Sequence, residues 1–212
     1  MRFSEGLGQT EMGTPIYQLD DDFITHPGSA GRPDSFCDVR IIKENGEIAG
    51  TGEVGEIVVR SPSLMLGYYK DPEATRAFFK HGPDWGCTGD MGYMDEEGFV
   101  TAVSRSKDMY ISGGENVYPV EVENVLCRHP SVFEAAVLGV PDKNWGEVGA
   151  AAIVLKPGGH ATEEEILEYG RRRLAKFKCP RYIKFYETLP KTPLGKVIKG
   201  NLLDDFKPMM EG

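Results

Sequence analysis

The sequence has few cysteines and no long apolar run. Its 212 residues include only four cysteines, which lie 40 to 52 residues apart and form no CxxC pair. That spacing is not typical of a zinc site, and reduced thiols in a cytoplasmic protein are the expected state. No stretch approaches the roughly 18 apolar residues of a membrane helix, and the N-terminal sequence MRFSEGLGQTE lacks an apolar signal core. We therefore expect a cytoplasmic protein without a transmembrane segment.

Basic residues are scarce in the first half of the chain. The formal net charge is −9, and residues 1–104 carry 8 Lys and Arg against 18 Asp and Glu. Residues 105–212 carry 16 against 15. The acidic first half argues against a nucleic-acid-binding surface. The change in charge predicts two modules, the second with basic groups available to an anionic ligand.

Residues 16–103 carry the pattern of short strands joined by turns. Asp71 is placed to cap a short helix that begins at Pro72, and Gly98 suits the turn of a hairpin. Several short strands in succession favour a small distorted β-barrel subdomain. The expected strands cover residues 38–43, 56–60, 91–94 and 99–103.

Residues 105–212 are expected to form a compact α+β domain. Pro119 begins a predicted helix, and Thr162 with Glu165 forms the capping box of another. Apolar strands are expected at 132–140, 148–155 and 182–186, and a final short helix at 202–206. The predicted fold class is α+β, with one domain over 1–104 and a mobile second domain over 105–212.

Polar groups that suit a nucleotide occur at two places in the first half. A glycine-rich turn precedes Thr10 and Glu11, whose hydroxyl and carboxylate suit a phosphate and its Mg²⁺. Taken alone, a plain loop is the commoner reading. Asp90 can accept both hydroxyls of a ribose diol, and Arg105 presents a fixed fork of donors. Without further context, Asp90 is more simply a turn residue.

Lys196 ends the segment PKTPLGK, which is not a phosphate loop because Val197 follows the lysine. A lone Gly-Lys pair usually marks an exposed loop. The alternative is a mobile lysine on a turn made flexible by Gly195, which could stabilise negative charge that develops in a transition state.

In this order and spacing, the segments TGD, SRSKD, SGGEN and PKTPLGK resemble the adenylate-forming enzymes, the superfamily of acyl-CoA synthetases, adenylation domains and luciferases. The resemblance is closest to fatty-acid and aryl acid–CoA ligases. Leu7 and Ser104 depart from the family pattern. The roles implied by the resemblance are Thr10 at the α-phosphate, Glu11 at Mg²⁺, Asp90 and Arg105 at the ribose, Lys107 at the hinge, Gly113 and Gly114 along the pantetheine tunnel, and Lys196 in catalysis.

The resemblance implies an acid–CoA ligase that uses ATP, Mg²⁺ and CoA and forms an acyl-adenylate. It covers only the C-terminal portion of a family member. We therefore expect an incomplete fold that is inactive alone and whose partner is the missing N-terminal portion. The sheet that residues 1–6 should join is expected to be absent, which would leave the first 13 residues disordered or paired unnaturally. An adenylation domain that loads a carrier protein, or a non-catalytic nucleotide-binding or docking module, are the alternatives. The sequence does not identify the carboxylic acid.

Two further segments have simpler interpretations. Trp145-Gly146-Glu147 is expected to pack near the turn at Gly113 and Gly114. The basic run 171–173 is most simply a solvated helix face, with contact to a CoA phosphate as the alternative.

Overall fold

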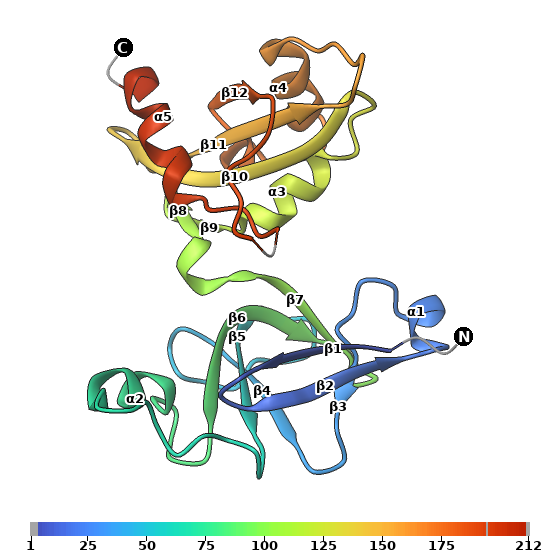
Figure 1. Ribbon diagram of the computed structural model, residues 1–212, viewed down its shortest axis with the longest axis vertical. Helices are drawn as coiled ribbons and strands as arrows, with labels where there is room; N and C mark the ends of the chain where they lie inside the picture. Colours follow the sequence, from blue (N-terminus) through green and yellow to red (C-terminus); the bar gives the residue numbers. More distant parts are fainter. Residues whose placement is uncertain (1–3, 194, 211–212) are drawn as a thin grey trace. The chain divides into compact units, whose positions relative to one another are not determined.

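A computed structural model describes residues 4–193 and 195–210 of the chain. The chain divides into two compact units, Met1–Ser106 and Lys107–Gly212 (Figure 1). Within the described ranges, no helix is both long enough and apolar enough to cross a membrane.

A four-stranded antiparallel sheet forms the centre of the first unit. Its strand order is β4 (Asp38–Ile42), β5 (Gly55–Arg60), β6 (Gly86–Met94) and β7 (Val100–Arg105). Residues 57–59 of β5 are fully buried, because their side chains pack into hydrophobic clusters on both faces of the strand. The predicted hairpin is confirmed as the pairing of β6 with β7.

The α+β class is confirmed, but the described strands form open sheets and no closed barrel. Strands β4 and β7 are the two edges of the four-stranded sheet and do not pair with each other. Beyond β7, the only bridge among the described residues joins Val100 to Gly31. A single bridge cannot close the ring of hydrogen bonds that defines a barrel.

The N-terminal segment is supported by strands of its own unit. Strand β1 (Ser4–Gln9) pairs antiparallel with β2 (Gly13–Leu19), which also pairs with β3 (Arg32–Pro33). The expectation of disorder is therefore wrong for the described residues of this segment. The sequence pattern did not reveal β2 and β3.

Two helices complete the first unit. Helix α1 covers Asp22–Thr25 and α2 covers Pro72–Phe78. The Asp71 carboxylate accepts a hydrogen bond from the Ala74 backbone N–H at 2.9 Å, which confirms the predicted cap. Phe78 is the buried residue that holds α2 against the unit.

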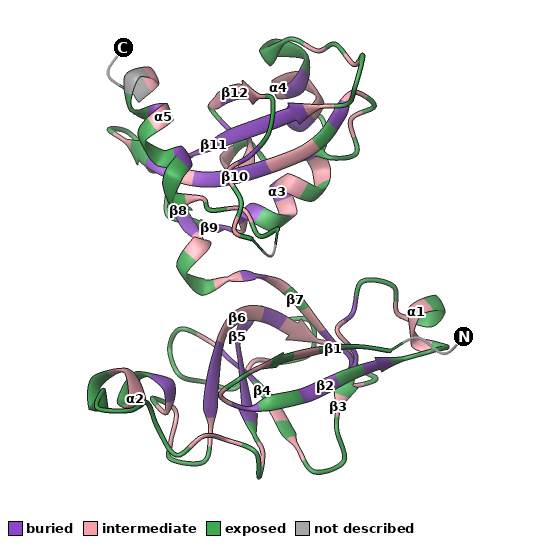
Figure 2. Ribbon diagram, viewed as in Figure 1, coloured by how far each residue is buried: buried purple, intermediate pink, exposed green. Residues whose placement is uncertain are grey.

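The second unit is a five-stranded sheet covered by helices on both faces. The strand order is β10 (Val132–Asp142), β11 (Gly146–Leu155), β8 (Tyr110–Ser112) and β9 (Glu115–Val117). Strand β12 (Tyr182–Tyr186) pairs parallel with β11. Figure 2 shows that β11 is almost continuously buried.

Alternate residues of β10 and β11 face different helices. Val137, Ala151 and Ile153 pack with α3 (Pro119–Leu126) and α4 (Glu163–Arg171). The residues on the other face of the sheet pack with Leu202 and Phe206 of α5 (Gly200–Met210). They are Ala136, Leu138, Ala150 and Ala152. The capping box of α4 is confirmed, with Thr162 and Glu165 bonding reciprocally.

Tyr110 lies inside this unit against two glycines of the sheet. Its ring leaves no room for a side chain at Gly139, where a Cβ would lie 2.3 Å from the Tyr110 Cβ. A Cβ at Gly149 would lie 2.5 Å from the phenolic oxygen. The residue is 2% exposed, and its hydroxyl has no hydrogen-bond partner among the described protein groups.

Candidate functional site

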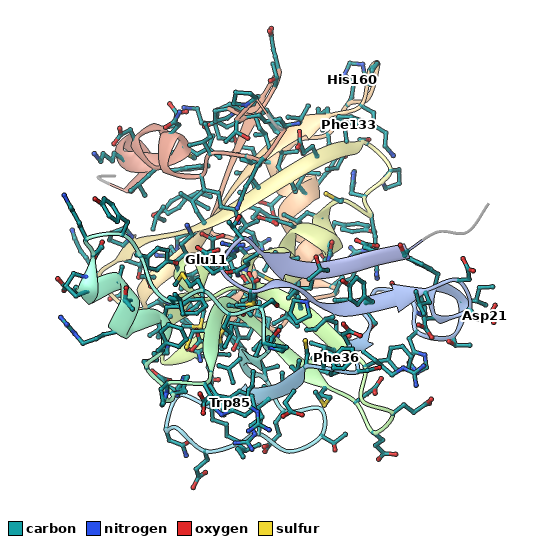
Figure 3. The ribbon with its side chains drawn as sticks, turned by 60° about the horizontal axis from the view of Figure 1, so that its bottom comes forward. Glu11, Asp21, Phe36, Trp85, Phe133 and His160 are labelled. Atoms are coloured by element: carbon teal, nitrogen blue, oxygen red, sulfur yellow. The ribbon has the colours of Figure 1, made fainter. Side chains whose placement is uncertain are left out.

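The turn between β1 and β2 holds Thr10 and Glu11. The Glu11 backbone carbonyl accepts from the Met65 N–H at 2.8 Å, and its side-chain Oε1 accepts from the Tyr68 hydroxyl at 2.8 Å. Glu11 is labelled in Figure 3. Burial, and then the bond to Glu11, raise the pKa of Tyr68, so the phenol remains a donor. Thr10 is exposed and Glu11 is half-buried. Both side chains present hard oxygen atoms, which fit Mg²⁺ and phosphate chemistry.

Asp90 and Arg105 face each other on paired strands. They occupy one register position of β6 and β7, and Arg105 Nε lies 2.9 Å from Asp90 Oδ1. Thr88 fixes the local backbone, because its hydroxyl donates to the Ile57 carbonyl at 2.7 Å and accepts from the Asp90 N–H at 3.0 Å. The Arg105 side chain is 41% exposed and that of Asp90 only 14%. The ion pair therefore orients both groups at the end of the sheet.

One hydrogen bond links these two places. The Gln9 side-chain amide donates to the Thr88 backbone carbonyl. The turn at Thr10 and Glu11 is thereby tied to the strand that carries Asp90. Sequence reasoning missed Gln9, since the residues it joins are 79 positions apart and nothing local signals the contact.

Lys107 and the glycine pair belong to the second unit. Lys107 is exposed in a short 3-10 segment, Ser106–Asp108. Gly113 and Gly114 form the turn between β8 and β9 with φ values of +61° and +88°. The Gly113 N–H donates to the Trp145 carbonyl at 2.8 Å, and a Cβ on Gly113 would lie 2.7 Å from the indole ring. The predicted packing of Trp145 near this turn is confirmed.

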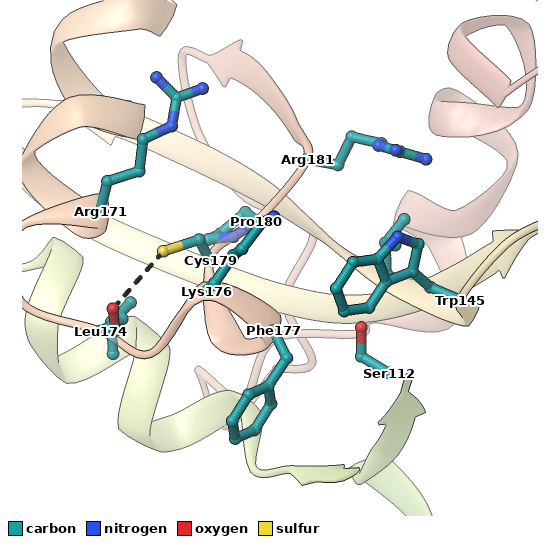
Figure 4. Close-up of a pocket in the computed structure, with 10 residues that line it drawn as sticks. Ser112, Trp145, Arg171, Leu174, Lys176, Phe177, Cys179, Pro180 and Arg181 are labelled. Carbon is teal, nitrogen blue, oxygen red and sulfur yellow. Dashed lines mark hydrogen bonds between the residues drawn. The ribbon is translucent and has the colours of Figure 1, made fainter. Parts of the chain in front are cut away.

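A cavity of about 590 Å³ opens beside the Trp145 ring (Figure 4). Its walls combine aromatic rings with cations: Trp145, Phe177, Arg171, Lys176 and Arg181. The mixture suits a ligand with a flat ring and phosphate groups. The sequence pattern did not reveal the cavity, because its walls come from distant segments.

The basic run 171–173 divides among different roles. Arg171 lines this cavity and also pairs with Glu164 at 2.7 Å, and Arg172 Nε pairs with Glu168 at 2.9 Å. The Arg173 guanidinium stacks over the Tyr169 ring at 3.7 Å. Of the three arginines, Arg171 alone is among the residues that line the cavity, and a ligand phosphate would share its guanidinium with Glu164.

Lys196 lies in a small hairpin between β12 and α5. The Thr192 N–H donates to the Lys196 carbonyl at 2.8 Å, and the Lys196 N–H donates to the Thr192 hydroxyl at 3.1 Å. Gly195 has φ +83°, which favours glycine there. The Lys196 side chain is exposed. Leu194, part of the motif, lies outside the described residues.

A cluster of Glu56, His81 and Cys87 has ligand atoms within 4.8 Å of one another. The sequence had shown no histidine at ligand spacing from a cysteine, and the fold brings this one close. Lys80 Nζ lies 2.6 Å from the Glu56 carboxylate, and burial raises the pKa of the Cys87 thiol to about 11. Because the carboxylate already has a cation and the thiol keeps its proton, we treat the cluster as an ion-pair network.

Comparison with known proteins agrees with this arrangement. Residues 1–69 match the family model of the AMP-binding enzymes and residues 121–196 that of the AMP-binding enzyme C-terminal domain. The chain is 44% identical to a feruloyl-CoA synthase of an Amycolatopsis species over 97% of its own length and 42% of the relative's. It is 43% identical to a 2-succinylbenzoate–CoA ligase of Bacillus cereus over 92% of its length and 40% of the relative's.

Solved structures give the same result. ATP-bound MatB from Rhodopseudomonas palustris superimposes with a TM-score of 0.90 at 34% identity, over 98% of this chain and 41% of that one. An o-succinylbenzoate–CoA synthetase from Bacillus subtilis, in complex with ATP and magnesium, gives 0.85 at 36% identity, over 96% and 42%. The chain thus spans about two fifths of the length of these relatives. From its fold, its motifs and these matches, the chain belongs to the adenylate-forming family of AMP-binding enzymes.

Proposed function

We propose that the chain is the C-terminal portion of an AMP-forming acid–CoA ligase. The observation that carries this proposal is the cavity of aromatic and cationic side chains beside the glycine turn. An adenine nucleotide that bears phosphates, as CoA does, matches those walls. The family match supports the same reaction class. The acid substrate and the remaining portion of the enzyme lie outside what these residues specify.

In the first half-reaction, a carboxylate oxygen attacks the α-phosphorus of ATP and pyrophosphate leaves, giving an acyl-adenylate. Asp90 accepts hydrogen bonds from the ribose hydroxyls, and Arg105 keeps that carboxylate oriented and donates to the nucleotide. The Thr10 hydroxyl donates to the α-phosphate. Glu11 would hold Mg²⁺, which supplies positive charge to the phosphates. The Lys196 ammonium stabilises the negative charge that builds on the reacting groups.

In the second half-reaction, the CoA sulfur attacks the acyl carbonyl carbon and AMP leaves. The Trp145 ring stacks with the CoA adenine, and Arg171, Lys176 and Arg181 bind its phosphates. The bare backbone of Gly113 and Gly114 allows the thin pantetheine arm to pass. Lys107 is the hinge at which the second unit changes orientation between the two steps.

A carrier-loading adenylation domain is not favoured. The relatives described above are a CoA synthase and CoA ligases, and a carrier protein delivers its pantetheine arm without the adenine nucleotide that this cavity fits. A cytoplasmic location stays a prediction.

The test uses a full-length enzyme that includes this chain. Lys196→Ala is expected to slow acyl-adenylate formation by about 10²–10³-fold and to leave thioester formation from supplied acyl-adenylate intact. The control is Lys207→Ala, an exposed lysine of α5 that pairs only with its helix neighbour Asp204 among the described contacts. If both half-reactions kept their rates in Lys196→Ala, the lysine would lose its proposed role.

CoA binding can be measured on the 212-residue chain itself. Calorimetric titration is expected to detect CoA binding that weakens at least tenfold in Trp145→Ala. If Trp145→Ala bound CoA with the same affinity as the wild type, the cavity would no longer support the proposal.

A further inference from the structure

The hairpin that carries Lys196 is closed at its base. The Ile198 N–H donates to the Pro190 carbonyl at 2.8 Å, and Lys191 and Val197 form a bridge between the two arms. Lys196 follows the turn and is exposed. The position of its ammonium is therefore set by whatever holds the two arms to the domain.

Glu123 holds the second arm. Its Oε1 accepts from Lys199 Nζ at 2.7 Å and from the Val137 backbone N–H at 2.8 Å. The Glu123 side chain is only 18% exposed and that of Lys199 only 22%. One carboxylate oxygen thus joins α3, β10 and the residue that precedes α5. Hydrogen bonds to a charged group are stronger than neutral ones, and this pair is partly sheltered from solvent screening.

The first arm has a weaker attachment of the same kind. Lys191 Nζ pairs with Glu134 of β10 at 2.9 Å, but its side chain is 37% exposed. Below the two ion pairs, Leu189 and Val197 pack into the apolar cluster that includes Leu202. The base of the hairpin is therefore fixed to the sheet, whereas the described residues of the segment that carries Lys196 make only local hydrogen bonds.

We propose that Glu123 is a positioning residue for Lys196. It anchors the hairpin through Lys199 and so limits the region that the Lys196 ammonium can reach. The inference rests on the proposed function, because it assigns the anchor to the half-reaction in which Lys196 acts. A carboxylate is required, since a neutral side chain would leave the half-buried Lys199 ammonium without its counter-charge.

Hydrogen exchange on the 212-residue chain tests the anchor without catalysis. In Glu123→Gln and in Lys199→Met, the amides of Thr192, Lys196 and Ile198 are expected to exchange at least tenfold faster. Lys199→Arg, which can keep the ion pair, is expected to retain protection. Unchanged exchange in both disruptive variants would overturn the inference.

The half-reactions of the full-length enzyme test the positioning role. Glu123→Gln is expected to slow adenylation about tenfold and to spare thioester formation from supplied acyl-adenylate, with Lys199→Arg close to wild type. Equal slowing of both half-reactions, or normal adenylation despite a loosened hairpin, would overturn it. Normal adenylation in Lys196→Ala would instead refute the role that the proposed function gives to Lys196, whereas the exchange result stands on its own.

Discussion

Replacing Tyr110 by Phe should stabilise the second unit. The hydroxyl is buried and has no hydrogen-bond partner among the described protein groups, so folding removes it from water without compensation. An unsatisfied buried polar group costs about 1–3 kcal/mol. Removing one oxygen changes the packing little, because the ring stays in place against Gly139 and Gly149. We expect a gain of about 1 kcal/mol at neutral pH, at the lower end of that range.

The assay is thermal unfolding followed by calorimetry. A gain of 1 kcal/mol corresponds to a rise of about 4–8 °C in Tm for a domain of this size. The matched control is Tyr186→Phe, because the Tyr186 hydroxyl donates to Asp205 Oδ2 at 2.8 Å. Its loss is expected to lower stability by about 1 kcal/mol. The two substitutions are chemically identical and should have opposite signs.

The pH dependence adds a second test. Burial raises the pKa of Tyr110 well above its ordinary value of 10, so the folded state keeps a proton that the unfolded chain loses. The wild-type free energy of unfolding must therefore fall as the pH rises above about 10. In Tyr110→Phe the contribution of Tyr110 to this loss is absent, so the stability advantage of the variant over the wild type should grow with pH. A destabilised Tyr110→Phe, comparable with the control, would show that the hydroxyl has a partner and refute the reasoning.

Three further predictions concern the backbone and the thiols. Asp71→Ala should destabilise the first unit by about 1 kcal/mol through loss of the helix cap, measured by urea unfolding with Asp71→Asn as the conservative control. Gly113→Ala should lower the free energy of unfolding by about 1 kcal/mol more than Gly114→Ala. Both glycines have a positive φ, but only at Gly113 would an added Cβ clash with the indole ring of Trp145. Equal losses of stability in the two variants would contradict this contact. Iodoacetamide at pH 8 should alkylate the exposed Cys127 before the buried Cys87, whose pKa is about 11. Mass spectrometry measures the order of labelling, and faster labelling of Cys87 would contradict its burial.

Local signals predicted the elements of this fold well. Asp71 before Pro72, and Thr162 with Glu165, mark helix starts through contacts that span three residues. The hairpin at Gly98 follows from turn chemistry, since that glycine has φ +82°. Each of these structures is determined by neighbours in the chain, so their residues alone identify them.

Contacts between distant segments could not be predicted in the same way. The barrel interpretation found the four strands of the central sheet but could not tell whether the two edges of that sheet would pair. The Glu123–Lys199 ion pair spans 76 residues, and the cavity joins Trp145 to Phe177 through the fold of the whole unit. The sequence around a charged or aromatic residue is the same whether its side chain faces solvent or a ligand, so the sequence alone does not distinguish the two cases. The resemblance to a known family supplied candidates, whereas the structure supplied their neighbours.

The alanines of β10 and β11 act as spacers whose volume sets how near α5 lies to the sheet. Ala136, Ala150 and Ala152 pack in the same cluster as Leu202 and Phe206, and added methyl groups in a well-packed core are accommodated by shifts of the surrounding structure. A larger side chain would have to move α5 outward. Because α5 begins directly after Lys199, such a shift would carry the end of the lysine hairpin with it. Side-chain volume in this core would thus influence where the hairpin that carries Lys196 lies.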